Sequence, residues 1–153
     1  MTAHAATTSD LVVLQRAVEL SRRCPRSESA FAVGAVVVAA DGRELATGYS
    51  REGGDDRVHA EEAALAKLPP GAAVGGTVYS SLEPCSARAS RPISCTRLIL
   101  ASGAARVVFA WREPAVVVDG RGAEELAAAG IEVVEVPELA DAVREINAHL
   151  LRA

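Results

Sequence analysis

Three short segments of the chain hold residue types that can bind a metal ion and move protons: His59-Ala60-Glu61, Pro84-Cys85 and Cys95. One imidazole and two thiolates are ligands that zinc favours, and a catalytic zinc has three protein ligands and one open position. Such a zinc lowers the pKa of its bound water to about 7. The segments therefore predict one Zn²⁺ per chain, held by His59, Cys85 and Cys95 and carrying a water or hydroxide.

Glu61 supplies the proton-transferring group that such a site needs. When water attacks a ring carbon that bears an amine, one group can take a proton from the water, pass one to the ring nitrogen and protonate the leaving amine. Glu61 lies two residues after His59 at the start of a predicted helix, whose positive end favours a carboxylate. The signature of zinc deaminases is H-x-E followed by P-C-x-x-C. The chain departs from it in one respect, because nine residues separate Cys85 from Cys95.

Each of these residues also has a simpler interpretation. His59 could cap a helix, Glu61 could be a first-turn carboxylate without chemistry, and the two cysteines could be buried thiols or a disulfide. A structural zinc is a further alternative, but such sites usually have four protein ligands, and only three good ones are present. The combination of all segments favours a reactive metal site over these alternatives, whereas Cys24 is interpreted as a core residue.

Hydrophobic periodicity and turn residues predict an alternation of helices and strands around these segments. A helix capped by Ser9 and Asp10 runs to about Cys24, and the Asp41-Gly42 turn joins two antiparallel strands. The other predicted elements are strands at 33–40, 43–48, 77–82, 106–110 and 131–136, helices at 59–68, 95–102, 123–129 and 137–151, and loops at 49–57 and 84–94.

This order predicts a three-layer α/β/α sandwich with a five-stranded mixed sheet. The first hairpin is antiparallel, and the helix between the last two strands makes those strands parallel. Residues 1–8 are expected to form a flexible tail, and residues 9–153 a single zinc deaminase domain.

The overall composition argues against several partners. The net charge is −4 and no basic stripe is visible, so a nucleic-acid partner is disfavoured. The chain has neither a secretion signal at its start nor an apolar run of 18 residues, so we expect no membrane span and a cytoplasmic location. These features favour a small molecule, an amino-bearing heterocycle, as the substrate.

The motifs resemble those of the cytidine deaminase superfamily, from about Leu14 to Leu150. The pyrimidine deaminase domain of riboflavin biosynthesis is the most similar variety, on the run Ser-Leu-Glu-Pro-Cys-Ser at 81–86 and on Arg91-Pro92 before Cys95. The resemblance implies a cytidine deaminase-like fold, His59, Cys85 and Cys95 as ligands, Glu61 as the proton shuttle, and a homodimer or higher homo-oligomer.

The chain departs from the riboflavin deaminases around the expected pocket. They carry Pro-Asn-Pro before a Val-Gly pair, whereas this chain reads Ser-Ala-Phe-Ala at 29–32, which is more similar to free-cytidine deaminases. Ser50 stands where a histidine is expected, and the cysteine spacing is one residue longer. The catalytic residues are kept while the pocket differs.

Five residues are candidates for contact with the substrate. The aromatic rings could wall or stack on the ring, the hydroxyl could bond a sugar or ring edge, and the arginines between the two cysteines could bind a phosphate or carboxylate. The alternatives are a core residue for the phenylalanine, a solvated loop residue for the serine and the arginines, and a subunit contact for the tryptophan. The candidates are Phe31, Ser50, Arg88, Arg91 and Trp111.

These features together predict zinc-dependent hydrolytic deamination of a small amino-bearing nucleobase, nucleoside or nucleotide. A pyrimidine is favoured, with the diaminopyrimidinone of the riboflavin pathway as the named candidate. A purine or triazine base is the alternative within this chemistry. A transfer-RNA-editing deaminase and a non-catalytic zinc-binding assembly protein are the alternatives outside it.

Overall fold

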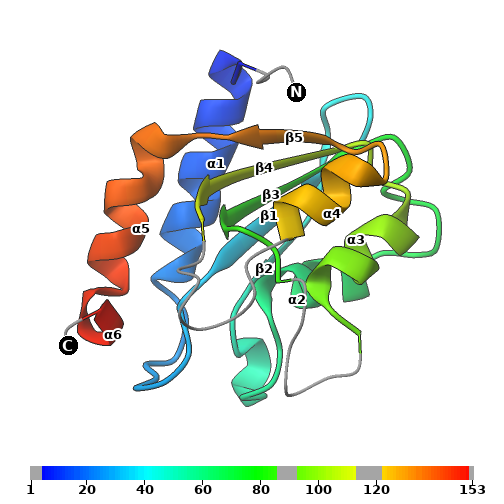
Figure 1. The fold of residues 1–153 in the computed structure, drawn as a ribbon. Coiled ribbons are helices and arrows are strands. Elements are labelled where there is room, and N and C mark those ends of the chain that lie inside the picture. Colours follow the sequence, from blue (N-terminus) through cyan, green and yellow to red (C-terminus); the bar gives the residue numbers. More distant parts are fainter. Residues whose placement is uncertain (1–4, 86–92, 113–121, 152–153) are drawn as a thin grey trace.

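A five-stranded sheet in the order β2-β1-β3-β4-β5 forms the middle layer of the computed structural model, which describes residues 5–85, 93–112 and 122–151 (Figure 1). The strand β1 is antiparallel to β2 and to β3, whereas β3, β4 and β5 are mutually parallel. The strands are β1 (Gly34–Val38), β2 (Glu44–Tyr49), β3 (Thr77–Leu82), β4 (Arg106–Trp111) and β5 (Glu132–Glu135). The predicted mixed sheet and its strand directions are confirmed.

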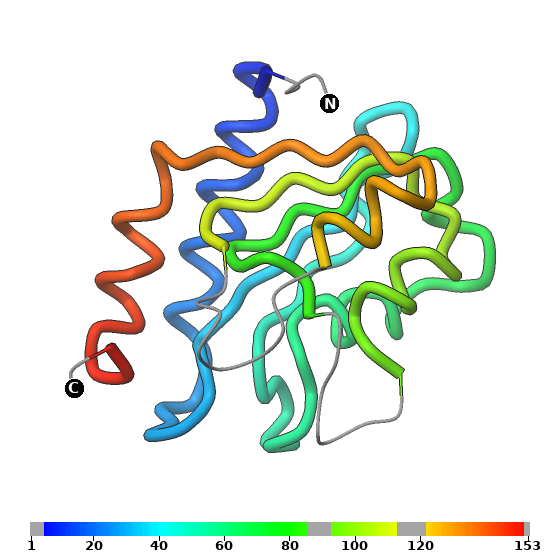
Figure 2. Tube along the Cα trace, in the orientation of Figure 1, coloured from blue at the N-terminus to red at the C-terminus, as the bar shows by residue number. Residues whose placement is uncertain are grey.

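Helices cover both faces of this sheet, as the Cα trace shows (Figure 2). One face carries α1 (Thr8–Ser21) and α5 (Ala140–Ile146). The other carries α2 (Ala60–Ala66), α3 (Cys95–Ser102) and α4 (Gly122–Ala128). The shorter helical segments are η1 (Glu52–Gly54), η2 (Pro137–Leu139) and α6 (Ala148–Leu151). The predicted three-layer α/β/α sandwich is therefore confirmed.

The two faces have separate aliphatic cores, because successive side chains of a strand point to opposite faces. Val36 belongs to the core beneath α1 and α5, and Val37 to the core beneath α2, α3 and α4. All five residues of β1 and all six of β3 are buried, which explains why both segments are continuously apolar or small rather than alternating. No helix in the described ranges has both the length and the apolar character to cross a membrane.

The first helix starts and ends earlier than the sequence predicted. Thr7, not Ser9 or Asp10, is the N-cap: its hydroxyl accepts the Asp10 N–H at 3.0 Å, while the Asp10 carboxylate accepts the Thr7 N–H at 3.0 Å. This reciprocal capping box places Asp10 in the first turn. The helix ends at Ser21 rather than near Cys24, because the following amides bond to the carbonyl three residues back and tighten the chain into turns.

The predicted last helix, 137–151, is also corrected, because it is divided into η2, α5 and α6. The division between α5 and α6 falls at Asn147, which is 1% exposed. Its side chain bonds to main-chain groups of Ala32 and Val143 instead of facing solvent. An asparagine side chain that competes for backbone groups favours a helix break, which the hydrophobic stripe of this segment could not show.

An ion pair between the buried Asp10 and the partly exposed Arg106 ties α1 to the sheet. The Asp10 carboxylate accepts two bonds from the Arg106 guanidinium, at 2.9 and 3.0 Å, and a third from the Tyr79 hydroxyl at 2.8 Å. The Arg106 guanidinium, more than the Thr7 and Tyr79 hydrogen bonds, holds the pKa of Asp10 well below its usual value against the opposing effect of burial. Burial and the Asp10 carboxylate raise the pKa of Tyr79 to about 12.

The substitution Asp10→Asn should lower the free energy of unfolding by about 1.5–3 kcal/mol at neutral pH, because it removes hydrogen bonds to a charged partner. A lowered carboxyl pKa stabilises the fold at pH values above the unfolded-state pKa near 4, and this contribution disappears as the pH falls further. Denaturant unfolding of both proteins between pH 7 and pH 3 should therefore give a difference that shrinks only below about pH 4. The matched control is Glu19→Gln, since Glu19 pairs with Arg22 on the surface. A difference that is independent of pH would contradict the role of this pair.

Candidate metal centre and active site

The candidate metal-binding residues meet at the edge of the sheet where β3 and β4 end. Cys85 follows β3 by three residues, Cys95 is the first residue of α3, and His59 immediately precedes α2. Because β1 runs antiparallel to β3, the start of β1 and the end of β2 lie at the same edge. The fold thus brings together residues that are far apart in the chain.

The three side chains are close enough to share one metal ion. The His59 Nδ1 atom lies 3.4 Å from the Cys95 Sγ atom and 3.7 Å from the Cys85 Sγ atom, and all three ligand atoms lie within 4.8 Å of one another. Tetrahedral zinc with ordinary Zn–N and Zn–S bonds places nitrogen and sulfur ligands about 3.5 Å apart. His59, Cys85 and Cys95 therefore fit a zinc ion in both type and spacing, and they are the only metal-binding cluster found among the described residues.

The local electrostatics favour the thiolate form of Cys85, which is the form that binds metals. The neighbouring Cys95 thiol lowers the pKa of Cys85 against the opposing effect of burial, and the His59 ring and the Cys95 N–H lower it further. The Cys95 N–H donates to the Cys85 Sγ atom at 3.3 Å. Cys95 itself is fully buried and Cys85 is 9% exposed, so solvent has little access to either sulfur.

The start of α3 places both cysteines. The Ser94 hydroxyl caps this helix by accepting the Arg97 N–H at 3.2 Å. The Thr96 N–H donates to the Cys85 carbonyl at 3.1 Å, so the first turn of α3 binds the main chain of Cys85 as well as its sulfur. In the sequence, the serine directly before Cys95 indicates where this helix begins, because serine is a favoured N-cap residue.

The start of α2 places His59 and Glu61. The Glu62 carboxylate accepts the His59 N–H at 3.3 Å, and the Ala63 N–H donates to the His59 carbonyl at 2.9 Å. The helix rests closely on β2 at Gly48, where an added Cβ atom would lie 2.5 Å from the Ala60 carbonyl oxygen. Glu61 is 4% exposed in the first turn, next to the histidine.

Two residues that the sequence analysis did not single out hold the Pro84-Cys85 segment. The buried Glu83 carboxylate accepts the Ala123 N–H at 3.0 Å, and the Glu83 N–H donates to the Trp111 carbonyl at 2.8 Å. Gly122 packs so closely that an added Cβ atom would lie 1.9 Å from the Pro84 carbonyl oxygen. Glu83 lies in the run at 81–86 that carries the resemblance, but no local pattern shows which group either residue contacts, because the contacts join α4 and β4 to a loop far away in the chain.

The aromatic substrate candidates contact each other at this edge. The ring centroids of Phe31 and Trp111 lie 5.8 Å apart with an interplanar angle of 84°, an edge-to-face arrangement. Phe31 packs on the core beneath α2 and α3, the same side of the sheet as His59.

Of the polar substrate candidates, only Ser50 lies within the described residues. Ser50 is 4% exposed, and its hydroxyl accepts the Val33 N–H at 3.0 Å, so the alternative of an exposed loop serine is wrong. The same hydroxyl donates to the Val33 carbonyl at 3.4 Å, so it anchors the start of β1. Arg88 and Arg91 lie outside the described residues.

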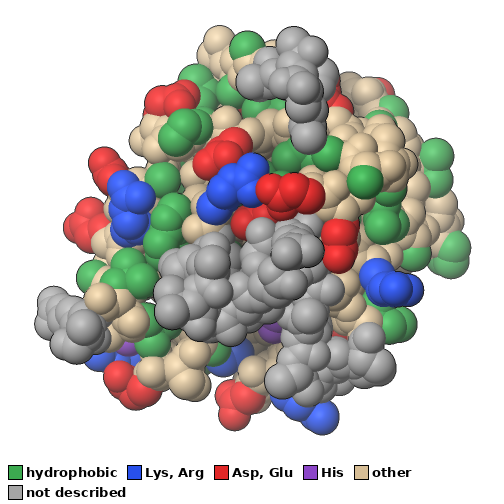
Figure 3. Space-filling model, in the orientation of Figure 1, with side chains coloured by type: hydrophobic (Ala, Val, Ile, Leu, Met, Phe, Trp, Pro, Cys, Tyr) green, Lys and Arg blue, Asp and Glu red, His purple; other side chains and the backbone are tan. Residues whose placement is uncertain are grey.

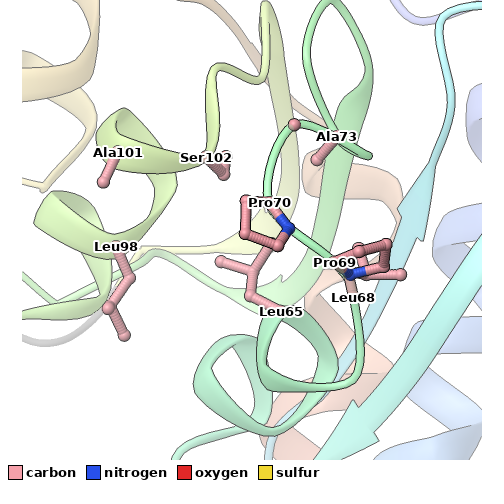
Figure 4. A pocket seen from close by; sticks show the side chains of 9 residues that line it. Leu65, Leu68, Pro69, Pro70, Ala73, Leu98, Ala101 and Ser102 are labelled. Carbon is pink, nitrogen blue, oxygen red and sulfur yellow. The ribbon is translucent and has the colours of Figure 1, made fainter.

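A shallow apolar pocket of about 260 Å³ lies elsewhere (Figure 4). It is lined by Leu65 in the last turn of α2, by the Leu68-Pro69-Pro70 run that follows this helix, and by Leu98 and Ala101 of α3. His59 and Cys95 are at the opposite ends of these two helices. This pocket is therefore separate from the metal-binding residues.

Charged side chains of both signs are interspersed on the face shown in Figure 3, where basic and acidic groups lie next to one another. Pairing of this kind is found at Arg112, directly after β4, whose guanidinium bonds to Glu83, Glu124 and Glu135. The positive charge of Arg112 is thus paired with acidic residues of this chain.

An α/β/α sandwich that carries a histidine and a cysteine at the starts of two helices, and a second cysteine just after a central strand, defines the class of zinc-binding deaminase folds. The family model of the cytidine and deoxycytidylate deaminase zinc-binding region matches residues 7–111. The chain belongs to this family, and zinc held by His59, Cys85 and Cys95 is typical of it.

Known relatives confirm the resemblance to the riboflavin deaminases. The chain is 40% identical over 124 residues to the diaminohydroxyphosphoribosylamino-pyrimidine deaminase of Schizosaccharomyces pombe, covering 78% of this chain and 30% of the relative. It is 41% identical over 115 residues to the riboflavin biosynthesis protein RibD of Aquifex aeolicus, covering 75% of this chain and 31% of the relative. The chain thus spans about a third of the length of these curated relatives.

Solved structures agree with the fold. RibD of Acinetobacter baumannii superposes with a TM-score of 0.79 at 31% identity, covering 94% of this chain and 39% of that one. The Rib2 deaminase of Aspergillus oryzae, in complex with DARIPP, superposes with a TM-score of 0.78 at 24% identity, covering 91% of this chain and 90% of that one. The cytidine deaminase-like fold is confirmed by both.

Replacing either metal-binding cysteine by serine should remove zinc, since a neutral hydroxyl is a far poorer zinc ligand than a thiolate. We expect the purified wild-type protein to hold one zinc per chain, and Cys85→Ser and Cys95→Ser to bind zinc at least about 100-fold more weakly. Loss of a residue that only hydrogen-bonds to a metal ligand costs about 10–100-fold in affinity, so loss of a ligand should cost more. Competition with a chromogenic chelator measures this affinity. The matched control is Cys24→Ser, because Cys24 lies outside the cluster and donates to the Val33 carbonyl. Zinc loss in the control, or none in the other two, would refute the assignment.

Proposed function

We propose that this chain catalyses the hydrolytic deamination of a small amino-bearing pyrimidine, and that the substrate is the diaminohydroxyphosphoribosylaminopyrimidine intermediate of riboflavin biosynthesis. The observation that carries the proposal is the convergence of the ligand atoms of His59, Cys85 and Cys95 within 4.8 Å of one another. The nearly buried Glu61 lies two residues after His59, in the first turn of α2. The Schizosaccharomyces pombe relative, which carries this activity in its name, supports the choice of substrate.

The chain's own residues divide the work of the reaction. Zinc bound by His59, Cys85 and Cys95 supplies the acidity that lets water act as a nucleophile at neutral pH. Glu61 accepts the proton that the attacking water loses and delivers it to the ring nitrogen next to the amine-bearing carbon. Glu61 then transfers the remaining hydroxyl proton to the amine, so that the carbon keeps the oxygen and ammonia leaves.

The pocket walls complete the proposal. Phe31 and Trp111 lie at the same sheet edge as the metal ligands, and we assign them to the ring of the substrate. Arg88 and Arg91, between the two cysteines in the chain, stay predictions for the phosphate. Ser50 also stays a predicted contact, although its hydroxyl already bonds to Val33. A single domain over residues 9–153, a cytoplasmic location and a homo-oligomer are part of the same proposal.

The substrate is tested by ammonia release from zinc-loaded protein. We expect turnover of the riboflavin-pathway diaminopyrimidine, with kcat/KM of at least about 10⁴ M⁻¹s⁻¹, the lower end for ordinary enzymes. Cytidine, guanine and an aminotriazine, offered at the same concentration, should be turned over at least about tenfold less efficiently. Efficient turnover of another ring would replace the substrate while keeping the chemistry. Failure of every ring, with authentic deaminases active in parallel, would refute the enzymatic function.

The substitution Glu61→Gln tests the proton shuttle, because the amide keeps the shape of the side chain and cannot carry the proton. We expect kcat to fall by about 10²–10⁴-fold with zinc content unchanged. Glu138→Gln is the control, since Glu138 is an exposed carboxylate far along the chain from the metal ligands. Unchanged ammonia release by Glu61→Gln would show that another group moves the proton.

A further inference from the structure

The segment between α1 and β1, residues 25–33, is held in place from two separate parts of the fold. It contains Phe31, and its main-chain groups bond to the side chains of Ser50, Arg51, Asn147 and His149. The first two follow β2, whereas Asn147 lies between α5 and α6 and His149 lies in α6. Because all these bonds go to main-chain atoms, they fix the path of the segment whatever its side chains are.

Arg51 is the first of the two main anchors. It is 5% exposed, and its backbone has a φ of 60°, a conformation that non-glycine residues rarely adopt. Its guanidinium donates to the Pro25 carbonyl twice, at 2.8 and 3.2 Å, and to the Phe31 carbonyl at 3.3 Å. One planar fork therefore joins the start of the segment to Phe31, which a lysine could not do with the same geometry.

Asn147 is the second anchor, and it binds the residue next to Phe31. Its Oδ1 atom accepts the Ala32 N–H at 2.7 Å, and its Nδ2 atom donates to the Ala32 carbonyl at 3.2 Å and to the Val143 carbonyl at 3.1 Å. The side chain thus pairs with both main-chain groups of Ala32, as a neighbouring strand would. The break between α5 and α6 is where this residue lies.

The two anchors therefore hold Phe31 against Trp111 at the sheet edge that carries the metal ligands. Trp111 is fixed in turn, because its carbonyl accepts the N–H of Glu83, two residues before Cys85. An aromatic ring held in this way offers a flat apolar surface to a planar heterocycle. A ring that moved freely would make this contact with the heterocycle only part of the time.

We propose that Arg51 and Asn147 are positioning residues that keep Phe31 in place as an aromatic wall of the substrate pocket, with Trp111 as its support. The proposal rests on the proposed function for the identity of the ring, but the arrangement of the wall does not depend on it. The anchors act on binding rather than on proton transfer, so they govern KM more than kcat.

The single tryptophan of the chain allows a direct test, because all tryptophan fluorescence comes from Trp111. The variants are Arg51→Lys, which keeps the charge but loses the fork, Asn147→Asp, which keeps the acceptor but loses both donors, and Phe31→Ala. The matched control is Arg26→Met, since Arg26 lies in the same segment and pairs on the surface with Glu28. Zinc content and circular dichroism identify any variant that does not fold.

In the folded variants, both anchor substitutions should shift the Trp111 emission and increase its quenching by acrylamide, as Phe31→Ala does. The KM for the riboflavin-pathway diaminopyrimidine should rise about tenfold while kcat stays within about threefold. In a Phe31→Ala background, Arg51→Lys should add little to KM, because its effect passes through that ring. Arg26→Met should match the wild type in every measurement.

Three results would overturn the proposal: wild-type fluorescence in both anchor variants, a fall in kcat at constant KM, or an Arg51→Lys effect on KM that persists without Phe31. If the wild-type protein deaminates no ring, the proposed function fails, and the fluorescence still decides whether the anchors hold the aromatic pair. The two failures are therefore distinguishable.

Discussion

The metal-binding site depends on the hydrogen bonds between the first turn of α3 and Cys85, in the loop that follows β3. The Cys95 N–H donates to the Cys85 sulfur, and the next amide, of Thr96, donates to the Cys85 carbonyl. These bonds place two sulfurs from different elements next to each other. The Cys95 thiol, more than the His59 ring and the Cys95 N–H, then lowers the pKa of Cys85 against the opposing effect of burial. The imidazole of His59, at the start of another helix, then completes a set of three ligands of the type that zinc prefers.

Close main-chain contacts bring the elements to this point. Gly48 lets α2 lie directly on β2, and Gly122 lets α4 lie on the Pro84 carbonyl. A side chain at either position would collide with main-chain atoms, which cannot move aside as a flexible side chain can. The buried Glu83 links the same loop to the Ala123 amide in the first turn of α4, so the metal-binding loop is supported from several sides.

The aromatic edge of the site has a different kind of support. Arg51 and Asn147 hold the segment that carries Phe31 entirely through its carbonyl and amide groups. In the riboflavin deaminases that the chain resembles, a Pro-Asn-Pro segment occupies the corresponding place. A main chain that is held independently of its side chains can keep its path when those side chains differ. This fits a chain that keeps the metal-binding residues of its family while residues 29–32 read Ser-Ala-Phe-Ala.

Much of the architecture could be predicted from local patterns. The strand Thr77–Leu82 and the helix Cys95–Ser102 have the predicted ends, because Gly103 and the flanking turns mark them in the sequence. The first helix and the C-terminal helix were predicted less well. Thr7 caps through a reciprocal bond with Asp10, and Asn147 interrupts a continuous apolar stripe in order to bond to Ala32. Both errors arise where a polar side chain bonds to a main-chain group instead of following the helical periodicity.

The sequence by itself determined the chemistry of this protein, because the histidine, the glutamate two residues later and the cysteines are residue types with few other uses in such a combination. It also predicted the antiparallel first hairpin and the parallel last two strands through hydrophobic patterning and turns, whereas the order β2-β1-β3-β4-β5 comes from the structure. Only the tertiary structure decided what surrounds that chemistry: that Ser50 bonds to Val33, that Arg51 and Asn147 hold the Phe31 segment, and that Gly122 contacts Pro84. These contacts join residues that are distant in the chain, and no local pattern records which distant main-chain group a side chain will meet.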